Sequence, residues 1–357
     1  MEKMMHWYER YMAPVAFMAG FALDVFTLLR TDALFDNVVL IAHLAVAGMG
    51  IVLINAYESG RIRGGAVERF AHLLPIPIQF SFGALFSGFT VLYARSGSLA
   101  GSGVFLGLLA LVLLANEFSR ERYRHVVVHL CIYFTALFAY LIFAVPLVTK
   151  TIGAGTFLVS GGASIAGIAI VIGGIAFIAP NRIAGYRRSL LFGIGGVYLL
   201  FHVLYFANII PPIPLALKRL EVYHSVERTN GGGYLVTYEK PAWYEWLGIT
   251  SAVFHWRRGT AIYAYSAVFS PADINTTIFH HWSRYDPESG EWIEESVIPF
   301  AIAGGRAEGY RGYTLKQAIT TGKWRIEVRT GRGQLLGRRV FEVIEATEPP
   351  ALDTRKF

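Results

Sequence analysis

The chain has 357 residues, of which 54% are hydrophobic and only 16% are charged, and its formal net charge is +7. Soluble globular domains carry about a quarter charged residues, so this apolar excess predicts a chain that is partly embedded in a lipid bilayer. From Lys218 onward the charges nearly balance, with 18 Lys and Arg against 16 Asp and Glu. Because no basic stripe concentrates on the water-soluble part, we expect no nucleic-acid partner. Cys131 is the single cysteine, which excludes an intrachain disulfide.

Residues 1–210 are predicted to be a polytopic transmembrane domain, because apolar runs of about 20 residues, the length of a bilayer-spanning helix, recur along them. We predict seven spans, with a tight helical hairpin between the third and fourth and a kink at Pro75 and Pro77. The predicted spans are Tyr11–Leu29, Asp36–Tyr57, Phe70–Ala94, Gly97–Ala115, Val126–Val148, Thr156–Ile178 and Ser189–Asn208.

Lys and Arg fall unequally on the two sides of these spans. Alternate loops hold eleven such residues on one side and three on the other, and positively charged loops resist translocation. The asymmetry predicts a bacterial inner-membrane protein with a cytoplasmic N-terminus. An odd number of spans then delivers the C-terminal domain to the periplasm, and an error of one span would reverse that side.

Small residues recur at four-residue spacings in the sixth span, as in Ala163–Gly167 and Ala169–Gly173, and the seventh span is also glycine-rich. Small residues let helix backbones approach closely in lipid. We therefore expect the sixth and seventh spans to pack face to face.

The chain changes character after the seventh span. Residues 211–247 hold a proline-rich exit, two strands over Glu221–Arg228 and Tyr234–Lys240 joined by a glycine-rich turn, and an aromatic interfacial stretch. This hairpin is interpreted either as the lead of the next domain or as a collar at the membrane surface. Residues 347–357 are predicted to be a polar tail.

Residues 248–346 alternate between apolar and polar side chains with a period of two. Regularly spaced turn signals divide this region into about seven strands, a pattern typical of an all-β, immunoglobulin-like sandwich. The turn signals lie at Arg258-Gly259, Asp286–Gly290, Gly304-Gly305, Thr321-Gly322 and Gly331–Gly333.

Three short elements of this region are arranged in an informative order: Phe279–Trp282, Gly322–Arg325 and Leu336–Phe341. In this order they resemble DUF2914, a bacterial domain family of unknown function that often lies at the C-terminus of multi-span membrane proteins. The resemblance extends over Ser251–Ile344. It implies a β-sandwich module and no particular activity.

A glycine-rich loop, Gly304–Tyr313, is the candidate binding site of the soluble part. Its glycines free backbone N–H groups, and Arg306, Tyr310, Arg311 and Tyr313 add planar donors and rings, a set suited to an anionic or sugar-bearing envelope polymer. The alternative is a crossover loop between two sheets whose tyrosines cover the edge of the core.

Ionisable residues inside the membrane are costly and therefore informative. Asp24, His43 and His202 fall at similar depths, roughly 8–10 Å below the outer surface, where together they would form a proton relay, a substrate-binding pair or a metal site. The alternative is that each histidine is hydrogen-bonded within a helix interface.

In the soluble part we predict neither a metal site nor a cofactor. His280 and His281 are adjacent on a strand and point to opposite faces, so one is expected to be packed and the other exposed. No familiar catalytic motif is present.

Two functions remain in view. The first is a non-enzymatic membrane protein that presents a periplasmic β-sandwich for binding an envelope glycan, a peptide or a partner protein. The second is a transporter or intramembrane enzyme whose bundle uses Asp24, His43 and His202. Both have the lipid bilayer as a partner.

Overall fold

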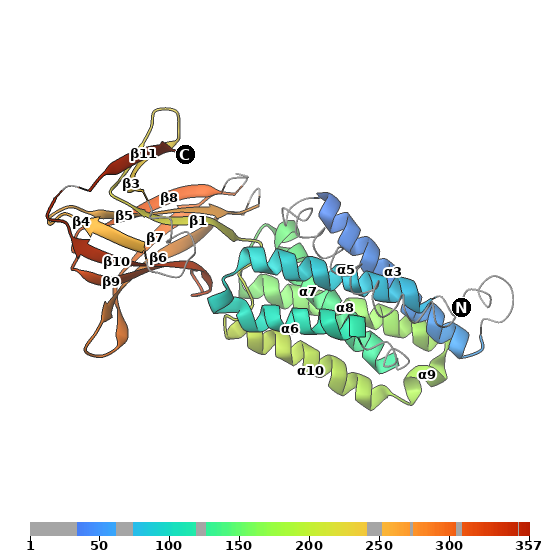
Figure 1. Ribbon diagram of the computed structural model, residues 1–357. Coiled ribbons are helices and arrows are strands. Elements are labelled where there is room, and N and C mark those ends of the chain that lie inside the picture. Colours follow the sequence, from blue (N-terminus) through green and yellow to red (C-terminus); the bar gives the residue numbers. More distant parts are fainter. Residues whose placement is uncertain are drawn as a thin grey trace, which may run out of the picture. The chain divides into compact units, whose positions relative to one another are not determined.

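The computed structural model describes residues 34–61, 74–118, 126–240, 252–271, 274–304, 309–348 and 350–357 (Figure 1). The chain divides into two compact units. The first comprises the described residues up to Arg95 together with Ser102–Pro214, and the second comprises Ser96–Gly101 together with Leu215–Phe357.

The first unit is built of long apolar helices. Five helices in its described part, α3, α5, α7, α8 and α10, are long and apolar enough to cross a membrane, and α6 contains a shorter apolar stretch, Gly101–Leu114. Five of the seven predicted spans therefore fall on helices of this kind, whereas the predicted first span, Tyr11–Leu29, lies outside the described residues. The helices are α3 (Leu34–Glu58), α5 (Pro75–Ser96), α6 (Leu99–Phe118), α7 (Val126–Thr149), α8 (Ala154–Ile178), α9 (Pro180–Ala184) and α10 (Arg187–Phe206).

The predicted kink at Pro75 and Pro77 is wrong. Helix α5 begins at Pro75, so both prolines lie in its first turn. A backbone N–H at these positions has no partner within the helix, and proline loses nothing by lacking it. The prolines therefore start this helix instead of bending it.

Helix α7 is the element on which α3, α8 and α10 pack. A Cβ atom added to Gly167 of α8 would lie 2.7 Å from Cδ2 of Leu137, and one added to Gly193 of α10 would lie 2.6 Å from Sγ of Cys131. Leu137 and Cys131 both belong to α7. These two glycines thus admit side chains of α7, and the expectation that they bring α8 and α10 together is wrong at these positions. At Gly161 of α8, by contrast, an added Cβ atom would lie 3.3 Å from the Tyr198 ring of α10.

Helices α8 and α10 meet each other through larger side chains. The rings of Phe157 and Tyr205 stack with their centroids 3.7 Å apart. Phe138 of α7 stacks on Phe157 at 5.6 Å and on Phe201 at 4.7 Å. Dispersion between such rings, together with the close approach of Tyr198 to Gly161, joins the two helices.

The second unit is built of strands. Seven strands are described between residues 252 and 345, as the turn spacing predicts, and the predicted turn signals lie at the junctions between them. The strands are β1 (Ala216–Tyr223), β2 (Ser225–Arg228), β3 (Tyr234–Glu239), β4 (Ala252–Trp256), β5 (Ile262–Phe269), β6 (Thr276–Asp286), β7 (Glu291–Ile302), β8 (Tyr310–Lys316), β9 (Gly322–Thr330), β10 (Leu335–Glu345) and β11 (Leu352–Lys356).

These strands form three sheets. One has the order β1-β5-β8, the second the order β4-β10-β9-β6-β7, and the third the order β11-β3-β2. Strand β4 pairs with β10 in parallel, with Phe341 opposite Ala252, and the other pairs are antiparallel. Several of these pairs join segments far apart in the sequence.

A buried polar network joins the first two sheets. His280 of β6 is fully buried, and its two ring nitrogens each lie 2.9 Å from a hydroxyl oxygen, those of Thr314 on β8 and Ser266 on β5. The indole N–H of Trp282 donates to Thr314 Oγ1 at 3.1 Å. If Thr314 in turn donates to Nδ1 of His280, Nε2–H is left to donate to Ser266, so a neutral imidazole is satisfied at both nitrogens.

The neighbouring histidine faces the other way, as predicted. His281 Nδ1 lies 2.6 Å from a carboxylate oxygen of Glu294 on β7. The adjacent pair therefore serves two faces of the sheet, with only His280 in the core.

The third sheet covers the β1-β5-β8 sheet. Tyr223, Val226, Val236, Tyr265 and Ala267 form a buried cluster between the two sheets, which we call the aromatic cluster. The β2–β3 hairpin thus packs on the β unit, in keeping with the interpretation that it leads this domain. Residues 347–357, predicted only as a polar tail, contribute β11 to the same sheet, because backbone pairing with β3 does not require apolar side chains.

The close approach at Gly304 gives a first prediction. A Cβ atom there would lie 1.8 Å from the carbonyl oxygen of Pro271 and 2.9 Å from that of Ile274, and backbone atoms cannot rotate away. We expect Gly304→Ala to lower the free energy of unfolding by about 1–3 kcal/mol, measured as thermal unfolding of the full chain in detergent. Gly331→Ala is the matched control, since its Cβ would meet nothing nearer than 3.6 Å. Equal stability of the two variants would contradict the assigned packing.

His280 gives a second prediction. Burial, and secondarily the charge of His281, lower the pKa of His280 from 6.5 to about 3. Between these values the unfolded chain binds a proton that the folded chain does not, so the stabilising contribution is complete above pH 6.5 and is lost as the pH falls toward 3. At pH 5 the loss from this group is about 2 kcal/mol.

The measurement is the unfolding of the full chain between pH 7.5 and pH 5. His280→Gln keeps groups able to bond both hydroxyls and removes the titration, so its stability should fall less over this range. An identical pH dependence of wild type and variant would show that His280 is not the buried neutral group.

Candidate functional site

The predicted glycine-rich loop is shorter than expected. Tyr310, Arg311 and Tyr313 lie on strand β8, where Tyr310 pairs with Val268 and Tyr313 with Tyr265 of β5. Arg306 lies outside the described residues. Tyr310 and Tyr313 are three positions apart on this strand, so their side chains stand on opposite faces of the sheet, and these residues do not share one loop.

Tyr313 belongs to the rim of the aromatic cluster. The residue is 38% exposed, and its ring lies 6.0 Å from that of Tyr234 and 5.9 Å from that of Tyr263. The Tyr234 hydroxyl donates to the backbone oxygen of Arg311 at 3.3 Å. The alternative interpretation, in which the tyrosines cover the edge of a core, describes this arrangement better than a ligand loop does.

The intramembrane histidines have different neighbours. His43 of α3 lies 3.3 Å from the Ser81 hydroxyl of α5. His202 of α10 lies 2.8 Å from the backbone oxygen of Tyr198, and its ring contacts Phe157. The two histidines thus have different partners, and Asp24 lies outside the described part of the chain, so the predicted three-residue cluster stays a prediction.

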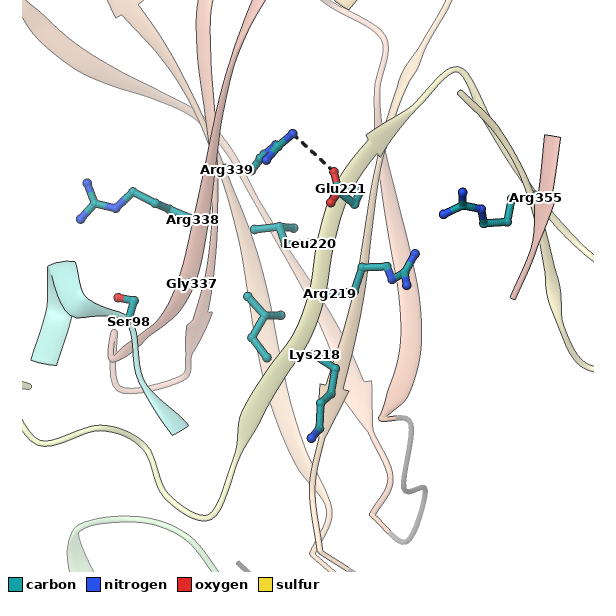
Figure 2. Close-up of a pocket in the computed structure, with 10 residues that line it drawn as sticks. Ser98, Lys218, Arg219, Leu220, Glu221, Gly337, Arg338, Arg339 and Arg355 are labelled. Atoms are coloured by element: carbon teal, nitrogen blue, oxygen red, sulfur yellow. Dashed lines mark ion pairs between the residues drawn. The ribbon is translucent and has the colours of Figure 1, made fainter. Parts of the chain in front are cut away.

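A different set of residues surrounds a hollow on the β unit. Two adjoining hollows of about 630 and 890 Å³ share Arg219, Glu221, Arg339 and Arg355 in their lining. We call this shared region the arginine groove (Figure 2). It lies where β1, β10 and β11 converge, so strands from all three sheets contribute to it.

Local strand geometry places these side chains. On β1, Arg219, Glu221 and Tyr223 alternate, so they stand on one face of the strand. Arg339 of β10 places a guanidinium nitrogen 3.6 Å from a carboxylate oxygen of Glu221. Arg355 comes from β11 and extends toward the space that Arg219 also faces (Figure 2).

Aromatic rings hold two of the arginines. The guanidinium carbon of Arg219 lies 4.0 Å from the ring centre of Phe357, and that of Arg355 lies 5.2 Å from the ring centre of Tyr238. Stacking of this kind orients a guanidinium. Arg355 also donates one N–H to the Tyr238 hydroxyl at 3.4 Å, and Arg219 donates to the Tyr223 hydroxyl, so the remaining N–H groups of each guanidinium are available. The side chains are thereby partly ordered before any ligand arrives.

The groove has an excess of positive charge. Its shared lining holds three guanidinium groups and one carboxylate. The Nε atom of Arg339 is buried and has no hydrogen-bond partner among the described residues. Burial raises the pKa of Tyr223 to about 12, with Glu221 contributing in the same direction, so this phenol stays neutral. Chemically, the groove can bind and orient an anionic group.

Glu239 and the two histidines that bond it, His224 and His255, form a hydrogen-bonded group beside the larger hollow, which we call the carboxylate clasp. Glu239 of β3 accepts from His224 Nε2 at 2.7 Å, and from the backbone N–H of His255 at 2.8 Å and its Nδ1 at 2.5 Å. Burial alone would raise the pKa of Glu239, but the hydrogen bonds from His224 and His255 hold it below its usual value. The clasp ties the third sheet to strand β4.

The clasp is not arranged as a metal site. The oxygen and nitrogen atoms approach one another directly at hydrogen-bond distances. In the described part of the chain, no group of three or more His, Cys, Asp or Glu side chains is placed to hold a metal ion.

No local sequence pattern singles out the groove. Arg219, Arg339 and Arg355 are separated by 120 and 16 positions along the chain, and Arg219 and Arg355 lie in segments predicted as a proline-rich exit and a polar tail. The available signal was the alternation of polar and apolar residues from Arg219 to Tyr223, which puts Arg219 and Glu221 on one face of a strand. This pattern indicates a binding site only when the neighbouring strands are known.

A comparison with protein families now adds to this geometry. The family model described as "Protein of unknown function (DUF2914)" matches residues 275–343. The chain carries a C-terminal DUF2914 domain. The matched DUF2914 residues include strands β6 to β9 and most of β10, so Arg339 lies inside the match, whereas Arg219 and Arg355 lie outside it.

Other comparisons add no argument to the DUF2914 assignment. No curated protein matches the chain. Among solved structures, a β-glucosidase from Listeria innocua matches with 10% identity and a TM-score of 0.19 over 35% of this chain, which spans only 16% of the enzyme's length.

Two further solved structures are similarly distant. An immunoglobulin-like protein from Pseudomonas aeruginosa matches with 13% identity and a TM-score of 0.19, covering 35% of this chain and 97% of that one. The alkylpurine DNA glycosylase AlkC from Pseudomonas fluorescens matches with 12% identity and a TM-score of 0.23, covering 89% and 99%. At these TM-scores the likenesses carry neither fold nor function to this chain.

The carboxylate clasp gives a third prediction. We expect Glu239→Gln to weaken the attachment of β3 by about 1–3 kcal/mol, because charge-assisted bonds to two histidines are lost. Hydrogen exchange of the β3 amides should accelerate in the full chain. Glu227→Gln, on the exposed end of β2, is the control and should leave exchange unchanged. Equal exchange in both variants would show that the clasp does not hold the sheet.

Proposed function

We propose that this chain is a multi-pass protein of the bacterial inner membrane that presents an immunoglobulin-like β-sandwich to the periplasm. In this proposal the domain binds an envelope glycan, a peptide or a partner protein, without catalysing a reaction. The arginine groove is the binding region. Its excess of guanidinium groups around one hollow is the observation that carries the proposal.

Strand order supports the immunoglobulin-like assignment. The run β10-β9-β6-β7 has the neighbours expected of strands G, F, C and C′, and β1-β5-β8 those expected of A, B and E. Trp282 is fully buried on β6, the strand equivalent to C, where immunoglobulin domains place a core tryptophan. The inter-sheet disulfide of antibody domains has no counterpart here, since Cys131 is the single cysteine of the chain.

The arrangement of charge supports the proposed orientation. The arginine-rich loops all fall on one side of the predicted spans, which favours a cytoplasmic N-terminus. In this proposal the chain has seven spans, and the β unit is periplasmic.

The nature of the groove favours binding over catalysis. Arginines stacked on rings recognise and position a group, whereas general acid–base chemistry needs a titrating side chain within reach of the bound molecule. The His224–Glu239–His255 clasp has its hydrogen-bonding atoms engaged with one another.

The fourth prediction tests both side and binding. Alkaline phosphatase fused after Phe357 should be active and a fluorescent protein fused there should be dark, with the opposite result for fusions after Arg61.

The full chain in nanodiscs should also co-sediment with bacterial envelope material. Replacing Arg219 and Arg355 together by Gln should weaken that co-sedimentation about tenfold or more, because two charge-assisted contacts are removed.

Arg257→Gln is the matched control, because Arg257 is exposed in the β4–β5 turn and does not line the groove. A cytoplasmic C-terminal reporter would overturn the orientation. Binding that is unaffected by the double variant would overturn the groove as the binding region.

A further inference from the structure

We propose that the arginine groove binds a phosphate group carried by a larger molecule. This inference rests on the proposed function and names the chemistry that the groove recognises. The carrier is either a phospholipid headgroup or a phosphate-bearing soluble polymer, since both offer the same group to the same arginines.

The charge balance indicates an anion of more than one unit. Three guanidinium groups and one carboxylate leave a formal excess of two positive charges in the shared lining. Guanidinium groups remain protonated at any physiological pH, so this repulsion cannot be relieved by losing a proton. A phosphate group of one to two negative charges offsets it.

The directions of the side chains also fit a phosphate group. Arg219 and Arg355 approach the same space from β1 and β11 (Figure 2). A carboxylate offers two oxygens in one plane and suits a single arginine fork, whereas a phosphate offers oxygens in several directions and can accept from forks on different strands.

Arg339 marks the third corner of the site. It already has a carboxylate neighbour in Glu221, but at 3.6 Å the two groups are beyond hydrogen-bond distance, and among the described residues the buried Nε atom of Arg339 has no partner. The Arg339 side chain is otherwise partly exposed, so its terminal N–H groups can donate to an oxygen of a bound phosphate.

The size of the hollows shows that phosphate is only part of the ligand. Hollows of about 630 and 890 Å³ are in the range that holds a whole small molecule or a segment of polymer. Phe254, Tyr238 and Phe357 line the larger hollow. These rings offer an apolar surface to the body that carries the phosphate.

The fifth prediction uses tripolyphosphate as a soluble probe of the full chain in phosphatidylcholine nanodiscs. We expect salt-sensitive binding, weakened about tenfold by Arg219→Gln and about tenfold by Arg355→Gln, since each removes a charge-assisted contact. Arg257→Gln should bind as the wild type does. Arg355 is exposed, so its variant is expected to fold, and thermal unfolding of each protein checks this.

A second arm identifies the carrier. Flotation with vesicles of phosphatidylcholine and phosphatidylglycerol tests the headgroup, and groove-dependent flotation supports a lipid source. Binding of tripolyphosphate without flotation supports a soluble polymer. Polyglutamate is the carboxylate comparison and should bind more weakly than tripolyphosphate.

Three results would overturn this inference: no binding of either phosphate probe, equal binding by the groove variants, or equal affinity for polyglutamate. If envelope material still bound through the groove in those cases, the proposed function would stand and only the phosphate assignment would fall. If envelope binding were also absent, both would fall.

Discussion

The aromatic cluster between the β1-β5-β8 sheet and the third sheet is the contact on which the rest of the β unit depends. Val236 and Tyr265 are almost completely buried there, and Tyr223 is 5% exposed. Removing such side chains from water stabilises the contact by roughly 1.5–3 kcal/mol each. Without this burial, β3 and β11 would have no apolar face to pack against, and Arg355 would not be held beside Arg219.

The groove is thus a consequence of packing that serves another purpose. Strand β1 contributes Tyr223 to the aromatic cluster and, by its alternation, presents Arg219 and Glu221 on the same face. The third sheet covers the rings of Tyr223 and Tyr265, and its strand β11 contributes Arg355 to the groove. A hydrophobic interface therefore fixes the position of polar groups around it, as is common where a binding site is built on rigid strands.

The helical unit follows a different logic, because burial from water gives no drive to helix association within lipid. Close packing takes its place. Glycines of α8 and α10 admit side chains of α7, and stacked rings such as Phe157 on Tyr205 fill the wider spaces. In the described part of this unit, His43 of α3 bonds Ser81 of α5, whereas His202 bonds a backbone oxygen of its own helix, α10.

The sequence by itself determined the two-part organisation, the positions of most long helices and the strands between residues 252 and 345. These features depend on local periodicity and turn chemistry, which are written in neighbouring residues: a run of apolar residues, an alternation as in Lys323–Arg329, or a glycine at a turn. The opposite roles of His280 and His281 followed from the same alternation.

Only the tertiary structure decided which helix the glycines face, that Tyr310–Tyr313 belong to a strand, and that the terminal segment completes a sheet. It also assembled Arg219, Arg339 and Arg355, which no local pattern connects. Each of these outcomes depends on pairing between distant segments. Backbone hydrogen-bonding groups are alike along the chain, so they do not specify which strand pairs with which. Alternation fixes the face on which a side chain stands, but the burial of distant apolar surfaces fixes what stands opposite it.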